Sequence, residues 1–243
     1  FPSVKSYIGI QTTNSGNVIR FSMGSDGFHG MLFKSGAKSQ YIDPYAKNDS
    51  SYMVYSKEDV TASEPFTCKV MDAMSYGDTP VNEVKNNKGE LSLDAGELQK
   101  KINPNDGTLR TYRLAMAATG EYSQYHLRDQ EVPNGASDQV KKAAVLSAIN
   151  TTMVRVNGIY ERDLGVNMQI VANNDKIVYL NGNSDPYSNE YLRKNNEVCN
   201  REIGTANYDI GHVVSTGSGG VAYLSVVCRD GAKAGGTTGR SNP

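Results

Sequence analysis

The sequence has little of what would assign a chain to a broad class at once. Its 243 residues include no Trp, only three Cys, and no apolar run long enough to cross a bilayer as a helix. The 25 Lys and Arg residues balance 26 Asp and Glu residues. The chain therefore has neither the excess of positive charge that is typical of nucleic-acid-binding proteins nor an acidic tail. We therefore expect a protein without a nucleic-acid partner and without a membrane partner.

What is present indicates a secreted chain. Gly, Ser, Asn, Thr and Tyr are plentiful, and the first residue is Phe1 rather than Met. Such a start is expected where a signal peptide has been removed. The cysteines are Cys68, Cys199 and Cys228, and because their number is odd, any disulfide leaves one thiol over.

Three kinds of sequence pattern divide the chain. Residues 1–76 alternate apolar and polar residues between turns, as in NVIRFSM and QYIDPY, and predict a small antiparallel sheet. Residues 77–108 are rich in charges, Asn, Gly and Pro, which predicts a linker. Residues 109–243 follow the order β-α-β-β-α-β-β and predict a mixed sheet with two main helices. The expected fold class is therefore α+β.

The clearest single element is a helix over residues 138–164. Ser137 can cap its first turn, and Gly165 can take the left-handed position after its last turn. Gly158 in the interior costs about 1 kcal/mol relative to Ala, which suggests that another element packs closely there. A second helix is expected at residues 188–204. Strands are expected at residues 109–122, 166–173, 175–180, 208–216 and 219–228.

No common catalytic motif is complete in the chain. The histidines, His29, His126 and His212, are widely spaced and never form H-E-x-x-H, the pattern that places two metal ligands on one helix face. Asp209 and His212 stand three apart on a predicted strand and so face opposite sides, which favours a packed or hydrogen-bonded histidine over a metal pair. The Gly-rich run before the last strand lacks the following helix that a nucleophile elbow or a phosphate loop requires.

The cysteines leave alternatives open. Cys199 lies in the second predicted helix and Cys228 ends the last predicted strand, so a disulfide between them is geometrically easy, although the other two pairings are not excluded. Cys68 is either a buried structural thiol or a thiolate that binds a metal or reacts as a nucleophile.

Several ordered segments resemble one family. NDGTLRTYRLAMAATGEYSQYH at 105–126, the stretch 145–171 and NYDIGHVVSTGSGGVAYLSVVC at 207–228 resemble the bacterial reprolysin-like zinc metallopeptidases, which are metzincins related in fold to the adamalysins. The first hundred residues, with RFSMGSDGFHGMLF and YIDPYAK, resemble the pro-domain that precedes the catalytic domain there. The resemblance implies a secreted zymogen of a zinc metalloendopeptidase, in which zinc-activated water hydrolyses peptide bonds.

The resemblance gives the last predicted strand a role. It implies that Val221–Val227 is the edge strand at the upper rim of the active-site cleft, where an extended substrate lies antiparallel and bonds to the backbone. The helix from Asp138 to Leu164 is then a scaffold helix without a catalytic group. The implied substrate-binding backbone is that of Gly220, Val221, Ala222, Tyr223, Leu224 and Ser225.

The zinc motif of the family has no counterpart here. In that family H-E-x-x-H-x-x-G-x-x-H, with three zinc-binding histidines and the catalytic glutamate, follows the segment that matches GAKAGGTTGRSNP. The sequence stops at Pro243 before such a motif. We therefore expect no catalytic residue in this chain, zinc ligands beyond Pro243, and an inactive chain on its own. Its expected partners are the remainder of the same protease, on a nicked second chain or in a longer form, and polypeptide substrates.

Cys68 gains a role in the same way. Pro-domains of this family often hold a cysteine whose sulfur occupies the open zinc position, and the resemblance assigns that cysteine switch to Cys68 in FTCKV. Activation is then expected by cleavage in the linker, near Lys100–Lys101. With Cys68 so assigned, Cys199–Cys228 becomes the preferred disulfide, although relatives also pair the strand cysteine with one beyond the zinc motif.

Two further hypotheses stay open. The chain could be a non-catalytic module that recognises extended peptides by strand addition, which an H-E-x-x-H motif in the encoded sequence after Pro243 would exclude. It could also be a pro-domain that acts in trans as an inhibitor or chaperone of a separate protease. That hypothesis predicts tight binding to the mature protease, which Cys68→Ser would abolish.

Overall fold

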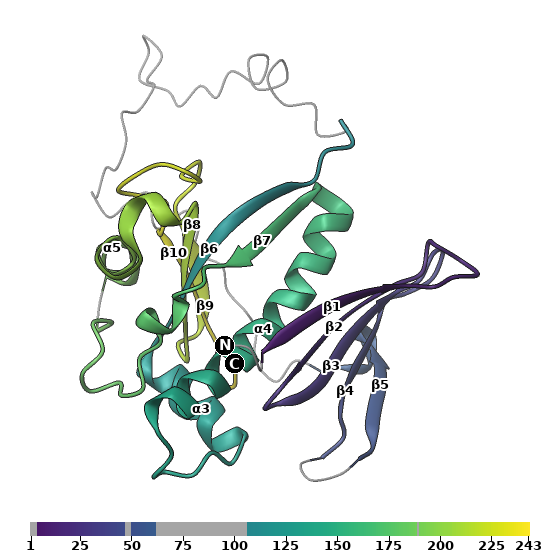
Figure 1. Cartoon of the computed structure of the whole chain (residues 1–243), viewed down its shortest axis with the longest axis horizontal. Coiled ribbons are helices and arrows are strands. Elements are labelled where there is room, and N and C mark those ends of the chain that lie inside the picture. The colour runs from purple at the N-terminus through teal and green to yellow at the C-terminus, as the bar shows by residue number, and fades with distance from the viewer. Residues whose placement is uncertain (1–3, 47–49, 62–105, 189) are drawn as a thin grey trace.

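The structure is a computed structural model that describes residues 4–46, 50–61, 106–188 and 190–243. These residues form two five-stranded β-sheets, and one long helix, α4 (Asp138–Leu164), contacts both of them (Figure 1). The first sheet is antiparallel and the second is mixed, so the expected α+β class is confirmed.

The first sheet is a meander in which each strand pairs with the next one along the chain. A two-residue turn at Ser25 and Asp26 joins its second and third strands, and Gly27 takes φ +101°, a conformation that glycine adopts without strain. At the end of β2 the polar Ser22 is buried and the apolar Met23 is exposed, the reverse of the arrangement that apolar–polar alternation predicts, because Ser22 Oγ lies 2.9 Å from Thr151 Oγ1 of α4. The strands are β1 (Lys5–Ile10), β2 (Val18–Gly24), β3 (Gly27–Phe33), β4 (Gln40–Pro44) and β5 (Tyr52–Ser56).

The second sheet has the strand order β7-β6-β8-β10-β9. All neighbouring strands run parallel except β9, which is antiparallel to β10. Residues 114–118 of β6, which lies between β7 and β8, are all buried, as expected for a strand covered on both faces. The strands are β6 (Arg110–Ala118), β7 (Val166–Ile170), β8 (Ile210–Ser215), β9 (Gly219–Ala222) and β10 (Gly236–Gly239).

Helices cover the two faces of this second sheet from opposite sides (Figure 1). On one face α4 contributes Val145, Ile149 and Met153 to a core with Leu114 of β6. On the other face α5 (Tyr191–Cys199) contributes Val198 and Cys199 to a core with Ala115 and Ala117. The helix predicted at 188–204 is therefore present, and its last turn is a π-helix at Asn200–Gly204.

The bounds and caps of α4 agree with the sequence prediction. Ser137 Oγ accepts a hydrogen bond from the Val140 N–H at 3.4 Å, and Gly165 ends the helix at φ +62°. Because both signals are local, the sequence alone could place both ends of the helix.

The strand expected over residues 109–122 was predicted too long. It ends at Ala118, and a further helix, α3 (Gly120–Asp129), follows it. Thr119 Oγ1 accepts a hydrogen bond from the Tyr122 N–H at 3.3 Å, and Glu121 stands in the first turn. Both signals were visible in the sequence, but the apolar run before them indicated a strand.

The strand expected at residues 175–180 was also wrong. A short 3₁₀ helix at Asn174–Ile177 replaces most of it, and one bridge from Ala118 to Val178 is its only pairing in the described structure. The buried Asn174 side chain explains this: its amide oxygen accepts from the Met116 N–H and its amide nitrogen donates to the Met116 carbonyl, both at 2.8 Å. A side chain thus pairs with β6 where a strand was expected.

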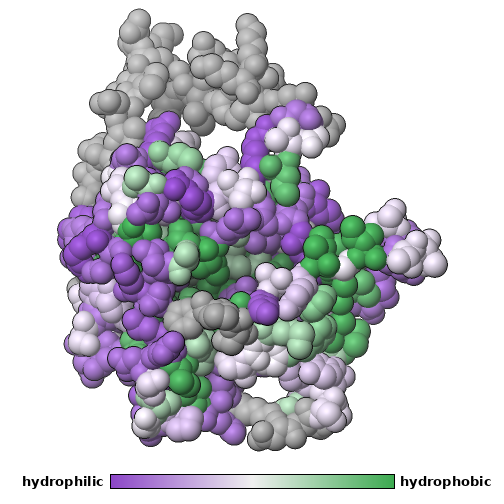
Figure 2. All heavy atoms as spheres, viewed as in Figure 1, coloured by the Kyte–Doolittle hydropathy of each residue, from purple (hydrophilic) through white to green (hydrophobic). Residues whose placement is uncertain are grey.

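The surface is mostly hydrophilic, with hydrophobic side chains gathered over the first sheet (Figure 2). On β1, Tyr7, Ile8 and Ile10 are largely exposed. No helix among the described residues is long and apolar enough to cross a bilayer.

Candidate functional site

The strand β9 lies at the free edge of the second sheet, next to β10 alone. Just beyond the strand, the Tyr223 N–H donates to the Gly235 carbonyl at 2.8 Å. Because backbone groups alternate sides along a strand, Val221 also turns toward β10. The N–H and C=O groups of Gly220 and Ala222 therefore point to the open side, where an extended chain could pair with them.

The edge strand is shorter than the sequence prediction. Of the expected residues, Gly220, Val221 and Ala222 belong to β9, whereas Tyr223, Leu224 and Ser225 lie beyond its end. Ser225 has φ +59° and Cys228 has φ +60°, so the backbone leaves the extended conformation there. Leu224 is consequently 58% exposed.

The neighbouring strand β10 was missed by the sequence prediction. Its sequence GTTG has no large apolar residue. A Cβ at Gly239 would lie 2.5 Å from the Gly217 carbonyl oxygen, and one at Gly236 would lie 2.7 Å from His212 Nδ1. Close packing thus requires glycine at both positions. The strand therefore has no alternation of apolar and polar residues from which it could be predicted.

Two buried asparagines of α5 hold the connection between β9 and β10. Asn195 Nδ2 donates to the Ala234 carbonyl at 2.8 Å, and Asn196 Oδ1 accepts from the Ala234 N–H at 2.9 Å. Nearby, the buried Lys233 ammonium donates to the Thr205 carbonyl at 2.6 Å and lies 4.6 Å from the centre of the Tyr208 ring. These contacts anchor the loop that positions β9, and no local sequence pattern indicated them.

A small hollow of about 220 Å³ adjoins the edge strand. Most of its wall is small side chains and backbone, which leaves room for a group of modest size. Its lining residues are Tyr191, Ser215, Gly217, Ser218, Gly219, Gly220, Val221, Thr237 and Gly239.

The expected disulfide between Cys199 and Cys228 is not formed. Cys199 is fully buried, and its Sγ donates to Asn195 Oδ1 at 3.6 Å, whereas Cys228 is exposed. Burial raises the pKa of the Cys199 thiol to about 12. The two cysteines are thus free thiols in different surroundings. Cys68 and the proposed cleavage site at Lys100–Lys101 lie outside the described residues.

The histidines do not form a metal site in the described part of the chain. His212 Nε2 lies 2.9 Å from Thr238 Oγ1, and burial lowers the pKa of His212 to about 4. Asp209 instead pairs with Arg113, with Nη2 and Oδ1 2.6 Å apart. Among the described residues no three His, Cys, Asp or Glu side chains gather as ligands. These residues therefore do not fit a catalytic zinc ion.

A second feature of the molecule is the interface between the first sheet and α4. A Cβ at Gly158 would lie 2.6 Å from two atoms of the Phe33 ring, so the expected close approach at this glycine is confirmed. The Arg162 guanidinium lies 5.2 Å from the centre of the same ring. Arg20 of β2 forms an ion pair with Glu161.

Buried polar contacts continue this interface along α4. Ser22 Oγ and Thr151 Oγ1 are 2.9 Å apart. The Asp26 carboxylate accepts from Thr151 Oγ1 at 2.8 Å and from Ser147 Oγ. The Asp43 carboxylate pairs with Arg155. The carboxylates Asp26 and Asp43 of the sheet are therefore matched by donors of the helix.

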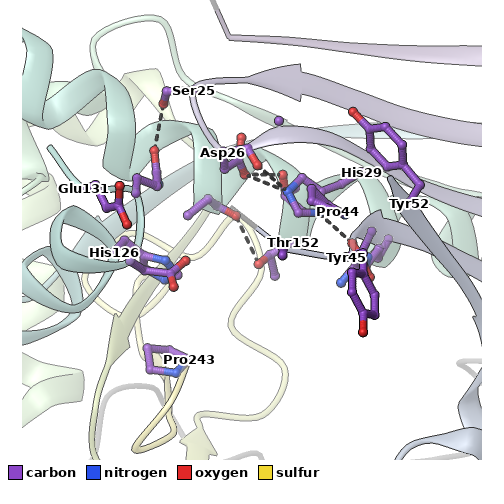
Figure 3. A pocket seen from close by; sticks show the side chains of 18 residues that line it. Ser25, Asp26, His29, Pro44, Tyr45, Tyr52, His126, Glu131, Thr152 and Pro243 are labelled. Atoms are coloured by element: carbon purple, nitrogen blue, oxygen red, sulfur yellow. Dashed lines mark hydrogen bonds and ion pairs between the residues drawn. The ribbon is translucent and has the colours of Figure 1, made fainter. Parts of the chain in front are cut away.

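A cavity of about 680 Å³ opens beside these contacts, between the first sheet and helices α3 and α4. Figure 3 shows Asp26 and His29 on the sheet side and His126 and Glu131 on the opposite side. Nε2 of His126 is buried and has no hydrogen-bond partner, and burial lowers the pKa of this histidine. The sequence prediction assigned no role to these residues, because they lie far apart along the chain.

Comparison with known families bears on the part of the chain that contains the edge strand. Residues 146–243 match the model of Reprolysin_3, described as metallo-peptidase family M12B, reprolysin-like. No curated protein matches the chain. The matched segment runs from α4 to the end of the chain and includes β8, β9 and β10. This part of the chain is therefore similar to the reprolysin-like metallopeptidases of family M12B.

Proposed function

We propose that the chain contributes two parts of a secreted zinc metalloendopeptidase: the substrate-binding edge strand and a latency sheet. The observation that supports this proposal is the position of β9, at the free edge of the sheet and within the segment that matches the reprolysin-like model. The described residues do not fit a zinc ion, so we derive no catalytic step through the metal.

Substrate binding follows from the backbone of the edge. An extended polypeptide that runs antiparallel to β9 can exchange hydrogen bonds with Gly220 and Ala222 without displacing β10. Backbone pairing of this kind is tolerant of sequence, which suits an endopeptidase. Side-chain preference would depend on neighbouring hollows such as the one lined by Tyr191 and Ser215.

In this proposal the domains keep their expected bounds. Residues 1–76 form the pro-domain, 77–108 the linker with its cleavage site, and 109–243 the first part of the catalytic domain. Cys68 is proposed as the zinc ligand of the latent form. The described strands of the first sheet end at Ser56 and those of the second begin at Arg110, which is compatible with a boundary between them.

A peptide-binding experiment tests the role of β9. The ¹⁵N-labelled 243-residue chain would be titrated with a tryptic digest of casein and followed by NMR. We expect the amide signals of Gly220 and Ala222 to shift. Ala222→Pro, which removes an outward N–H, should weaken binding at least tenfold, whereas Ala222→Ser, which keeps the N–H, should bind as the unchanged chain does.

Two results would count against this proposal. One is that the signals that shift lie away from β9. The other is that Ala222→Pro binds the peptides as well as Ala222→Ser does.

A non-catalytic peptide-binding module remains a second candidate, because no metal-ligand group occurs among the described residues. Mass-spectrometric peptide mapping of the natural protein distinguishes the two. Peptides that carry H-E-x-x-H in stoichiometric amount, together with bound zinc, would favour the protease. A natural protein that binds peptides but contains neither would favour the module.

A further inference from the structure

His29 of β3 lies between two oxygen acceptors. Its Nδ1 is 2.5 Å from Asp43 Oδ1, and its Nε2 is 3.0 Å from the Asp26 carbonyl oxygen. The second carboxylate is also near, with Nε2 3.6 Å from Asp26 Oδ2. Both ring nitrogens therefore face groups that accept hydrogen bonds, and neither faces a donor.

This arrangement suits only one protonation state of the ring. A neutral imidazole carries one N–H and one lone pair, so it can donate to Asp43 or to Asp26 but not to both. The remaining lone pair would then face an oxygen. The imidazolium carries two N–H groups and satisfies both acceptors, and its charge lies between two carboxylates.

The same two aspartates also hold α4. Asp26 accepts hydrogen bonds from Ser147 and Thr151, and Asp43 pairs with Arg155. The turn that contains Asp26 fits closely against the helix, because a Cβ at Gly24 would lie 1.7 Å from Ser147 Oγ. A small movement of this turn would therefore break contacts between the sheet and the helix.

Other ionisable groups around His29 come from every neighbouring element. Tyr55 of β5 donates to Asp43 Oδ2, and Arg155 of α4 pairs with Oδ1 of the same carboxylate. On the α3 side, His126 and Asp129 line the same cavity. Because His29 itself lines the cavity, a proton can reach it without unfolding of the chain.

The electrostatic balance favours the charged ring. Burial by itself lowers the pKa of His29, but the hydrogen bond to Asp43 and the charge of Asp26 outweigh burial and raise the pKa above its ordinary value. For Asp43, burial opposes ionisation, but hydrogen bonds from His29 and Tyr55 and the charge of Arg155 lower the pKa overall.

We propose that His29 is a proton-controlled latch between the first sheet and α4. Protonated His29 holds the Asp26 turn and the Asp43 carboxylate in the positions that bind the helix. Loss of the proton as pH rises releases one of these two bonds and weakens the docking of the sheet. Docking is therefore strongest in mildly acidic solution and becomes weaker above neutrality.

The latch concerns the docking of this chain's own sheet and stands apart from proteolytic activity. Only its use as a control of latency rests on the proposed function: a sheet that loosens as pH rises would separate more readily from α4. The test below measures docking alone, so its failure would leave the edge-strand proposal untouched.

The experiment uses the 243-residue chain. NMR of the histidine ring protons between pH 5 and 8.5 gives the midpoint of His29, whose signal is assigned by its absence in His29→Gln. Hydrogen exchange of α4 peptides at pH 5.5 and 8.0, normalised for intrinsic exchange, gives the opening of the interface. We expect a His29 midpoint above 6.5. Opening should increase by up to tenfold per pH unit between the unfolded and folded pKa values.

His29→Gln should make the opening independent of pH over this range, because Gln keeps a donor but does not titrate. His126→Gln, at the other histidine of the cavity, should retain the pH dependence of the unchanged chain. A His29 midpoint at or below 6.5, or equal pH dependence with and without His29, would overturn the proposal. If His29→Gln does not fold, the midpoint decides, with His29 assigned by elimination from His126→Gln and His212→Gln.

Discussion

At the scale of single residues, Gly158 shows how a weak sequence signal corresponds to a tertiary contact. In an isolated helix Gly158→Ala would stabilise by about 1 kcal/mol. In this molecule the new methyl group would meet the buried Phe33 ring at 2.6 Å. Because overpacking typically costs about 1–3 kcal/mol, we expect Gly158→Ala to leave stability unchanged or to lower it by up to about 2 kcal/mol. Urea unfolding at fixed pH measures the difference.

Gly135 provides the matched control for this prediction. It is exposed, and a Cβ there would meet nothing within 4 Å, so Gly135→Ala should be neutral or slightly stabilising. When Phe33→Ala has already removed the ring, adding Gly158→Ala should lower the free energy of unfolding less than Gly158→Ala does in the unchanged chain. A gain of about 1 kcal/mol for Gly158→Ala alone would show that the sheet does not pack on α4 at this point.

At the scale of elements, the position of β9 depends on α5. Asn195→Ala would leave the buried Ala234 carbonyl and the Tyr187 hydroxyl without their partner. An unsatisfied buried group costs about 1–3 kcal/mol, so we expect a loss of stability in this range. Hydrogen exchange of the β9–β10 hairpin should become faster, as measured by mass spectrometry of peptides from residues 219–239.

The exposed Asn183 serves as the control, because Asn183→Ala removes a surface side chain in a turn and should change neither quantity. Equal exchange of the β9–β10 hairpin in both variants would mean that the sheet ladder alone positions the edge strand. The anchoring role of α5 would then be wrong.

At the scale of the whole molecule, two histidines contribute to the pH dependence of stability in opposite directions, because folding lowers the pKa of His212 and raises the pKa of His29. Burial lowers the pKa of His212 to about 4, so folding favours its neutral form. The resulting stability is present above the unfolded pKa of about 6.5 and is lost as pH falls toward 4. The loss amounts to at most about 3 kcal/mol. His29, whose pKa is raised, contributes in the reverse direction.

Urea unfolding at pH 8, 7, 5.5 and 4.5 separates these contributions. We expect His212→Gln to flatten the decline of stability between pH 6.5 and 4 relative to the unchanged chain. His29→Gln should change the slope mainly above pH 6.5. An equally steep acid decline with and without His212 would show that this ring does not stay neutral in the folded state.

Much of the fold was predictable because its signals are local. Alternation predicted the first sheet, and the caps Ser137 and Gly165 placed α4. Prediction failed where long-range contacts override local pattern: Asn174 replaces a strand by pairing with Met116, and the glycines of β10 carry no apolar period. For the candidate site, the resemblance implied an edge strand over Val221–Val227; β9 does lie at the sheet edge but ends at Ala222, and its binding of substrate stays a prediction.

The sequence by itself determined the division into a β-rich part and an α/β part, the long helix, and the reprolysin-like segment. These features depend on residue periodicity, capping residues and ordered segments that are visible along one stretch of chain. Only the tertiary structure decided how the sheet docks on α4 and which backbone groups of β9 remain open. It also showed that Cys199 and Cys228 stay apart. The physical reason is distance along the chain: contacts such as Asp26 with Thr151 join residues that no local pattern links.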